Sequence, residues 1–392
     1  MTHAVERSAP SGVEGLLARR TAANEHFFAA EADRIARLCH GMAERFARGG
    51  RLIALGISPT ARSDVRHVAV EFVHPVIVGK RALPAIGLTL EGGPLVLQTE
   101  LTVEPGDIAI AFGGEREVVE ALALARARDC LTIALAHVGA EWEFEPPSDD
   151  PFVRQELVET LYHVLWELVH VFFEHRGLLA GRTAEPVYDS GASSFLYPFL
   201  GQQETDLDSV LADVSGSVVM KAQEIGALRE ATLTEHAGQL SAAAATLGDA
   251  LRSGGRLLAL GNGGSATDAM DVVADLRGKG LPALDLTEDS AILTAIANDV
   301  GPDLIFARQI IALGRPGDVV LALSTSGGSG NVIAALAEAR SRGIATIALV
   351  GYDGGRVAAE RLADHVIVTR SQHIPLIQEA QASAYHALIE LA

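Results

Sequence analysis

Cysteine and aromatic residues are scarce in this chain of 392 residues. Cys39 and Cys130 are the only cysteines, which excludes a disulfide framework and a four-cysteine zinc site and is typical of a reducing compartment. Aromatic residues make up 5% of the chain and hydrophobic residues 48%. Alanine, leucine and valine must therefore form the core, as they do where helices cover a parallel sheet.

Positive charge and long apolar runs are also lacking. Lysine and arginine number 31 against 50 acidic residues, so the formal net charge is −19 and nucleic acid is not expected as a partner. A small phosphorylated ligand remains compatible with this charge, because backbone N–H groups and helix N-termini can bind it locally. No apolar run is long enough for a membrane span, and the N-terminus lacks the pattern of a signal peptide. We therefore expect a cytoplasmic protein with no membrane partner.

The same motifs occur twice in the chain, in the same order and about two hundred residues apart. They are GGRLIALG (49–56) with GGRLLALG (254–261), LPAIGLT (83–89) with LPALDLT (281–287), EPGDIAIAF (104–112) with RPGDVVLAL (315–323), and TIAL at 132–135 and 346–349. This repeat predicts a duplicated domain. We place the copies at 1–176 and 205–392, joined by a linker at 177–204 that is rich in Gly, Pro and Ser.

Each copy opens with a long helical stretch, at about 12–48 and 217–252, and continues with apolar strands that alternate with amphipathic helices. Such alternation predicts parallel strands with right-handed crossovers. The expected fold class is α/β, with two tandem doubly wound, flavodoxin-like sandwiches, each carrying an added N-terminal helix.

Two loops in the second copy follow predicted strands and precede helices, at 261–265 (GNGGS) and 324–329 (STSGGS). Glycine N–H groups, hydroxyls and a helix dipole suit a phosphate group. The candidate phosphate-binding residues are Asn262, Gly263, Ser265, Ser324, Thr325, Ser326 and Ser329. The first loop also satisfies a relaxed dinucleotide fingerprint, with Asp285 ending the next strand, but that alternative does not explain the second loop.

These loops, with TAIAND (294–299) between them and GYDGG (351–355) after, resemble the sugar isomerase (SIS) domain, and phosphoheptose isomerases most. They are also similar to initiator-associating proteins. The resemblance covers 205–392, and 12–176 more weakly. It implies an aldose–ketose isomerase of a sugar phosphate, with sedoheptulose 7-phosphate and glycero-manno-heptose 7-phosphate as the expected pair. It also implies that Asp299 and Gln378 bind substrate.

The family pattern has a His-x-x-x-Glu pair after the first loop and a Gln-(x7)-His pair on the last helix. The glutamate is the implied base and the last histidine the implied acid, and the four together hold zinc in some members. The second copy keeps Gln378 and His386 but has Asp271 and Asp275 in place of histidine and glutamate. Asp275 and His386 are therefore an alternative catalytic pair.

The first copy shows the reverse combination. The residues His67, Glu71, Gln155 and His163 match the family's chemical set, whereas GISPT (56–60) and FGGEREV (112–118) replace the phosphate loops. Our hypothesis is a site divided between the copies, with Glu71 and His163 catalytic and His67, Glu71, Gln155 and His163 binding one zinc per chain. The phosphate would lie in the loops of the second copy.

Two other functions remain open. The chain could be a non-catalytic protein-interaction module, as the initiator-associating relatives are, or a sugar-phosphate sensor in which only the second copy binds ligand. Because the two long helices have a large apolar face, we also expect a homodimer that forms a pseudo-tetramer of SIS domains.

Overall fold

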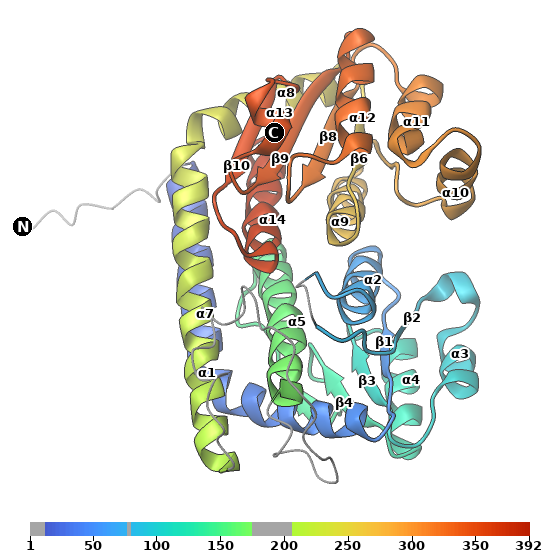
Figure 1. The fold of residues 1–392 in the computed structure, drawn as a ribbon, viewed down its shortest axis with the longest axis vertical. Helices are drawn as coiled ribbons and strands as arrows, with labels where there is room; N and C mark the ends of the chain where they lie inside the picture. The colour runs from blue at the N-terminus through green and yellow to red at the C-terminus, as the bar shows by residue number, and fades with distance from the viewer. Residues whose placement is uncertain (1–11, 77–79, 175–205) are drawn as a thin grey trace, which may run out of the picture.

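Two parallel five-stranded sheets, one in each half of the chain, form the centre of the protein (Figure 1). The computed structural model describes residues 12–76, 80–174 and 206–392. The first sheet has the order β2-β1-β3-β4-β5 and the second the order β10-β9-β8-β6-β7. Read from the opposite edge, the second order matches the first strand by strand, so the fold class and the duplication that the sequence predicts are confirmed.

The strands of the first half are short and separated by helices. Their bounds are β1 Leu52–Leu55, β2 Ala85–Leu88, β3 Ile108–Ala111, β4 Leu131–Ala134 and β5 Trp142–Glu143. The helices are α1 Val13–Ala47, α2 Pro59–Val73, α3 Leu95–Thr102, α4 Arg116–Ala127 and α5 Pro151–Glu174, with the 3-10 turn η1 Leu90–Gly92 before α3.

The second half repeats this plan, and its last three strands are longer than their counterparts. The strands are β6 Leu257–Leu260, β7 Ala283–Asp285, β8 Val319–Ser324, β9 Ala345–Gly351 and β10 His365–Thr369. The helices are α7 Leu207–Glu235, α8 Ala237–Arg252, α9 Gly264–Gly278, α10 Ser290–Asp299, α11 Ile305–Leu313, α12 Gly330–Ser341, α13 Gly355–Ala359 and α14 Ile374–Leu391, with the 3-10 turn η4 Pro302–Leu304 before α11.

Both faces of each sheet are covered, which explains why the strands are apolar throughout. Leu52 and Ala54 of β1 pack in one core with residues of α1, α2 and α5, whereas Ile53 and Leu55 pack in another with residues of α4. Successive side chains of a strand point to opposite faces, so an uninterrupted apolar run fills two cores at once. The second sheet shows the same division between two cores.

The helical stretch expected at 217–252 is two helices rather than one. His236 ends α7 with a non-helical backbone, and its Nε2 accepts a hydrogen bond from the Val368 N–H of β10 at 3.2 Å. This hydrogen bond fixes the junction of α7 and α8 against β10, an edge strand of the second sheet. The other expected long helix is continuous over Val13–Ala47.

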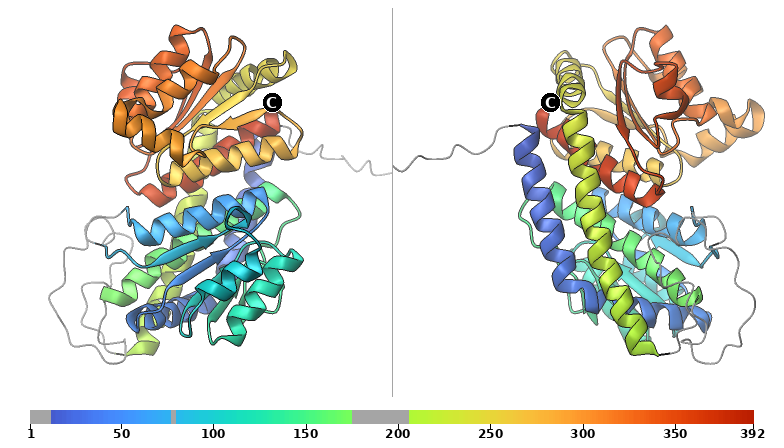
Figure 2. Two further views of the ribbon diagram at one scale, coloured as in Figure 1. Left: turned by 90° about the vertical axis from the view of Figure 1, so that its right-hand side faces the viewer. Right: turned by 60° about the vertical axis from the view of Figure 1, so that its left-hand side comes forward.

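The long helices α1 and α7 lie side by side (Figure 2). The first half of α7 packs into the core of the first copy through Val210, Val214 and Val218. The start of α1 in turn lies against the core of the second copy through Leu16 and Leu17. The apolar faces of these helices are thus buried against the chain's own cores, so they do not provide a surface for a dimer. The predicted linker at 177–204 lies outside the described residues.

Four helices meet where the two halves join. α2 packs against α9, and α5 packs against α14 (Figure 1). In each half these are the helix after the first strand and the last helix of the copy. The junction therefore brings together the two elements of each copy that carry the family's chemical motifs.

Among the described residues, no helix is both long enough and apolar enough to cross a membrane.

Candidate active site at the junction of the two halves

Helix α2 presents two of the predicted ligands on one face. The helix begins where Ser58 Oγ accepts the Ala61 N–H and Pro59 occupies the first turn. His67 and Glu71 follow four residues apart, so both side chains project from the same face. Both are buried, and His67 Nε2 lies 3.8 Å from Glu71 Oε1.

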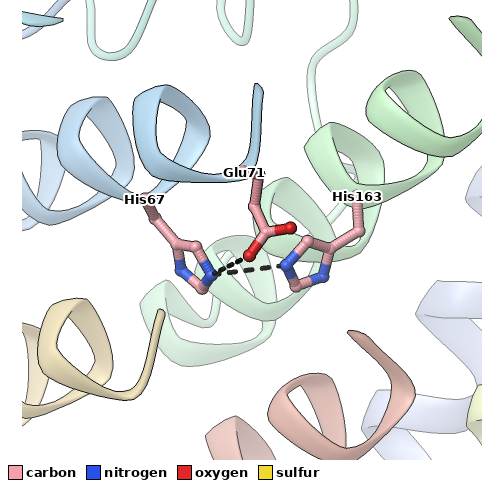
Figure 3. Close-up of side chains that lie close together, drawn as sticks. All are labelled: His67, Glu71 and His163. Atoms are coloured by element: carbon pink, nitrogen blue, oxygen red, sulfur yellow. Dashed lines mark hydrogen bonds and ion pairs between the residues drawn. The ribbon is translucent and has the colours of Figure 1, made fainter. Parts of the chain in front are cut away.

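Helix α5 adds His163 to this pair (Figure 3). The Nε2 atoms of His67 and His163 are 3.4 Å apart. The Nδ1 atom of each imidazole has its own hydrogen-bond partner: Tyr162 Oη lies 2.8 Å from His67 Nδ1, and Glu379 Oε1 lies 3.0 Å from His163 Nδ1. Both imidazoles therefore direct Nε2 toward one point beside the Glu71 carboxylate.

The fourth member of the set comes from the other half of the chain. Gln378, near the start of α14, places Nε2 3.3 Å from His67 Nε2. Gly264, the first residue of α9, lies against both side chains: a Cβ built there would be 2.0 Å from Gln378 Nε2 and 2.8 Å from His67 Nε2. We call His67, Glu71, His163 and Gln378 the His67 cluster.

Gln155 is not part of this cluster, contrary to the set predicted from the sequence. Gln155 and His163 are eight residues apart on α5, a rise of about 12 Å along the helix, so they cannot reach one ion. Gln155 Nε2 instead donates a hydrogen bond to Asp271 Oδ2 of the second half. The Gln-(x7)-His pair of each copy thus supplies its histidine to one cluster and its glutamine to the other.

A second polar cluster forms around Asp271. Tyr385 Oη donates to Asp271 Oδ2 at 3.1 Å, and Ser63 Oγ donates to Oδ1 at 2.6 Å. One turn later on α9, Asp275 Oδ2 lies 3.4 Å from His386 Nε2. We call Asp271, Asp275, His386 and Gln155 the Asp271 cluster. It occupies the position in the duplicated fold that corresponds to the His67 cluster.

The candidate phosphate loops of the second half lie beside one another, next to α14. The side-chain amides of Asn262 and Asn331 exchange two hydrogen bonds, at 2.9 and 2.8 Å, which join the first loop to the start of α12. Gln381, one turn after Gln378, contacts the Ser324 carbonyl oxygen at 3.5 Å. The loops are therefore positioned by the same helix that supplies Gln378.

The remaining predicted loop residues have different exposures. Ser265 and Ser324 are buried, Thr325 and Ser329 are half-buried, and Asn262, Gly263 and Ser326 are exposed. Gly263 has φ +58°, a left-handed conformation that favours glycine immediately before α9. Asp299 is exposed at the end of α10, where it accepts a hydrogen bond from the Asn298 amide. Its predicted role in substrate binding stays a prediction.

The corresponding loops of the first half are built differently. Pro59 lacks an N–H group, and the Ser58 hydroxyl already caps α2. In the other loop, the Glu115 carboxylate lies against Gly113, since a Cβ on that glycine would be 2.2 Å from Glu115 Oε2. A phosphate group there would meet negative charge, so these loops lack the properties of an anion site.

Burial sets the protonation of the His67 cluster. Burial raises the pKa of Glu71 to about 7. Burial also lowers the pKa of His67 well below its usual value, and the neighbouring His163 lowers it further. A neutral imidazole at His67 has a free nitrogen lone pair, as a metal ligand must.

In the Asp271 cluster the effects differ. Burial raises the pKa of Asp271 to about 7, and the charge of Asp275 contributes in the same direction. Burial opposes a charge on His386, but the carboxylates of Asp275 and Glu156 outweigh it and raise the pKa of His386 to about 9. The carboxylates around His386 thus favour positive charge at this place.

Two buried glutamates, Glu379 and Glu156, contact the histidines of the two clusters and were not assigned a role from the sequence. Glu379 accepts from Thr160 Oγ1 at 3.0 Å as well as contacting His163, and Lys221 Nζ of α7 lies 3.4 Å from its Oε1. Burial opposes the charge of Glu379, yet Lys221 and His163 outweigh it and lower the pKa to about 2. The sequence pointed to these glutamates only through their position, because Glu379 follows Gln378 and Glu156 follows Gln155. Glu156 indeed contacts His386 Nδ1, at 2.9 Å.

The His67 cluster has the donor chemistry of a zinc site. The ligand atoms of His67, Glu71 and His163 all lie within 4.8 Å of one another. Glu71 Oε2 and Gln378 Oε1 are buried and have no hydrogen-bond partner among the described residues, although buried polar atoms normally have one. Two imidazole nitrogens, a carboxylate and an amide form the mixed nitrogen and oxygen set that zinc accepts.

Comparison with known proteins identifies the type of domain. The sequence profile of the SIS domain matches residues 222–351. The phosphoheptose isomerase of Solidesulfovibrio magneticus is 45% identical over 175 residues, which are 43% of this chain and 84% of that protein. The phosphoheptose isomerase of Geotalea daltonii is 47% identical over 159 residues, 39% of this chain and 82% of that protein.

A solved structure extends the likeness to the whole fold. The tagatose-6-phosphate ketose/aldose isomerase of Escherichia coli superposes with a TM-score of 0.59, covering 100% of this chain and 95% of its own, at 17% sequence identity. This second likeness concerns the fold alone. The identity with the two relatives above shows that the chain belongs to the SIS-domain family, and its two matching sheets make it a tandem protein related to phosphoheptose isomerases.

Proposed function

We propose that the chain is an aldose–ketose isomerase of a sugar phosphate that interconverts sedoheptulose 7-phosphate and glycero-manno-heptose 7-phosphate. The reaction would take place at the His67 cluster, with the phosphate group in the loops of the second half. The similarity to phosphoheptose isomerases supports the substrate, and the geometry of the junction supports the position of the site.

One observation carries the proposal. Gly264 lies against His67 and Gln378, so the start of α9 touches the cluster to which the first half contributes three residues. The first half has the histidines and glutamate without a phosphate loop, and the second half has the loops without that set. Their direct contact supports a single site composed of both halves.

The loops would bind the phosphate group through backbone N–H groups, hydroxyls and the helix termini. α9 begins at Gly264 and α12 at Gly330, so two helix N-termini lie beside the loops. The positive end of each helix dipole favours an anion, and serine hydroxyls add donors. A phosphate at one end of a seven-carbon sugar leaves the carbonyl end to reach the cluster.

Glu71 is the proposed base. It takes the proton from C1 of the ketose, and an enediolate forms as the hydroxyl proton passes from O1 to O2. Return of the carbon-bound proton to C2 gives the aldose, so atoms and charge balance without an oxidant. The oxygen Glu71 Oε2, which lacks a hydrogen-bond partner within the described ranges, is the one available for this transfer.

His67, Glu71, His163 and Gln378 would hold the zinc ion. When bound, zinc supplies Lewis-acid stabilisation of developing negative charge on oxygen. His163 offers only Nε2, because Nδ1 is bonded to Glu379. We therefore assign His163 to metal binding rather than to the role of acid, and Gln378 replaces Gln155 in the predicted ligand set.

A turnover assay tests this function. The purified chain should isomerise sedoheptulose 7-phosphate, lose activity with a chelator and regain it with about one equivalent of zinc per chain. A six-carbon ketose phosphate assayed in parallel measures the preference for chain length.

The alternative is a non-catalytic SIS protein that binds a sugar phosphate or another protein. It would be supported by tight binding of the sugar phosphate with no turnover of any ketose phosphate by zinc-loaded protein. That result would contradict the proposed isomerase.

Glu379 should control zinc affinity through His163. In Glu379→Gln the amide oxygen can still accept the hydrogen bond from His163 Nδ1–H, but the negative charge that makes Nε2 a stronger ligand is lost. We expect the free zinc concentration needed for half-maximal turnover to rise about 10-fold or more. The measurement is turnover in zinc-buffered solutions.

Glu156→Gln is the matched control, because Glu156 makes the corresponding contact to His386 in the Asp271 cluster. Its zinc dependence of turnover should stay close to that of the unchanged chain. Equal shifts in both variants would indicate a general effect of removing a buried carboxylate and would contradict the assigned role of Glu379.

Dimerisation remains a proposal. Large apolar side chains are exposed on and next to α10 and α11, including Ile292, Val300 and Ile311, and on α3 at Leu97 and Leu101. These surfaces, rather than α1 and α7, are where a second copy would pack.

A further inference from the structure

The Asp271 cluster contains two buried polar atoms that face each other without a hydrogen bond. Asp275 Oδ2 and His386 Nε2 are 3.4 Å apart, and neither has a hydrogen-bond partner in the part of the chain that the structure describes. The side chains are only 8% and 0% exposed. A carboxylate oxygen and an imidazole lone pair repel, so positive charge must lie between them.

That positive charge is either a proton or a metal ion. A proton on His386 Nε2 would form a charge-assisted hydrogen bond, which is normally about 2.7–2.9 Å long. The observed separation is longer and suits two atoms that share an ion. His386 Nδ1 is already bonded to Glu156, so Nε2 is the atom directed at Asp275.

Asp271 completes a set of three donors. The ligand atoms of Asp271, Asp275 and His386 all lie within 4.8 Å of one another. Three hydrogen bonds orient the Asp271 carboxylate, from Ser63, Tyr385 and Gln155. A metal-binding carboxylate is commonly fixed by such contacts. Oδ2 accepts two of these hydrogen bonds and Oδ1 only the one from Ser63, so Oδ1 keeps a lone pair for an ion.

Carboxyl groups crowd the surroundings of this cluster. Burial and the charges of Asp271 and Asp275 raise the pKa of Asp64 of α2, so a further negative charge there is disfavoured unless a cation is present. Arg20 is bonded to Glu156 at 2.8 Å and so is committed to a different carboxylate. Buried carboxylates that lack a cation are costly, and a divalent ion compensates two of them.

Solvent can reach this place. A cavity of about 720 Å³ is lined by Asp275 and, from the first half, by Thr60 and Asp149. Asp275 thus connects the buried cluster with the cavity, and water molecules from it can complete a coordination shell.

We propose that Asp271, Asp275 and His386 form a second divalent-cation site, distinct from the His67 cluster and without a phosphate loop beside it. Two carboxylates, one imidazole and water form an oxygen-rich set, which suits Mn²⁺ better than the two-histidine set does. Because α9 and α14 supply the ligands and α2 and α5 supply Ser63 and Gln155, an ion here would stabilise the junction of the halves. The site rests on its own contacts and does not require the proposed isomerase activity.

Mn²⁺ titration of the chelator-treated full chain, followed by electron paramagnetic resonance, tests the site. We expect two equivalents per chain in the unchanged protein. Asp275→Asn, which keeps the shape of the side chain, should remove one equivalent and leave the other. Glu71→Gln is the matched variant in the His67 cluster and should weaken the other equivalent instead.

Thermal unfolding gives an independent measurement. Saturating Mn²⁺ should raise the Tm of Glu71→Gln and should raise that of Asp275→Asn less, because a ligand that binds only the folded state stabilises it. Asp271→Asn should lose the same equivalent of Mn²⁺ and show the same smaller rise in Tm as Asp275→Asn. Agreement between the two variants would show that a folding defect in one of them does not cause the result.

The outcomes separate the two proposals. If one equivalent of Mn²⁺ binds, and Asp275→Asn removes it while Glu71→Gln does not, the second site stands, and the zinc site of the isomerase is judged separately by the zinc dependence of turnover. If Asp275→Asn and Asp271→Asn both fold and keep every equivalent of the unchanged chain, a proton occupies the cluster and the inference is wrong.

Discussion

Glu71→Gln is expected to lower turnover of sedoheptulose 7-phosphate by about 10²–10⁴-fold, the usual contribution of a positioned general base. The amide has nearly the same shape but cannot take a proton. Binding of the sugar phosphate should survive, because the loops at Gly263–Ser265 and Ser324–Ser329 belong to the other half. Initial rates and calorimetric titration with substrate, both at saturating zinc, would measure the two effects separately.

Asp275→Asn is the matched variant for this experiment. Asp275 occupies the corresponding place in the duplicated fold, next to His386 rather than His163. We expect it to keep most of its turnover. Should turnover survive Glu71→Gln and be lost in Asp275→Asn, the chemistry would belong to the Asp271 cluster, and the proposed site would be wrong.

Gly264→Ala is expected to reduce turnover by about 100-fold, the effect of displacing a reacting group by roughly 1 Å. A Cβ at this position would be 2.0 Å from Gln378 Nε2 and 2.8 Å from His67 Nε2. The end of the Gln378 side chain must move away, and a ligand of the proposed zinc site is then lost. Zinc content and turnover should fall together, while the free energy of unfolding changes much less.

Gly278→Ala provides the control, because Gly278 is exposed at the other end of α9 and a Cβ there meets nothing within 4 Å. Alanine there should leave turnover within a few-fold of the unchanged chain and should not weaken the helix. Full activity in Gly264→Ala would contradict the contact between the phosphate loop and the His67 cluster on which the composite site depends.

Much of the fold could be predicted because strands and helices leave local signals. Leu257–Leu260 and Val319–Ser324 are apolar runs bounded by glycine and polar residues, and each is followed by an amphipathic helix. The break at His236 had no such signal. It depends on a hydrogen bond to Val368, more than a hundred residues away, which no local pattern contains.

The candidate site was predicted in its residue types and only partly in its grouping. His67 and Glu71 are four residues apart on one helix, so their proximity follows from helix geometry. Gln155 was grouped with His163 by resemblance, although two turns of helix separate them. Helix rise alone could have excluded that pair, but it could not have shown that Gln378 takes the place of Gln155.

The sequence by itself determined the duplicated α/β architecture, the phosphate loops and the chemical residues of each copy, because periodicity, spacing and loop composition are properties of neighbouring residues. Only the tertiary structure decided which residues meet. The packing of α2 on α9 and of α5 on α14 brings Gly264 and Gln378 to His67, and Gln155 to Asp271. Contacts between distant segments are set by how whole helices pack, and the order of residues along the chain does not encode them locally.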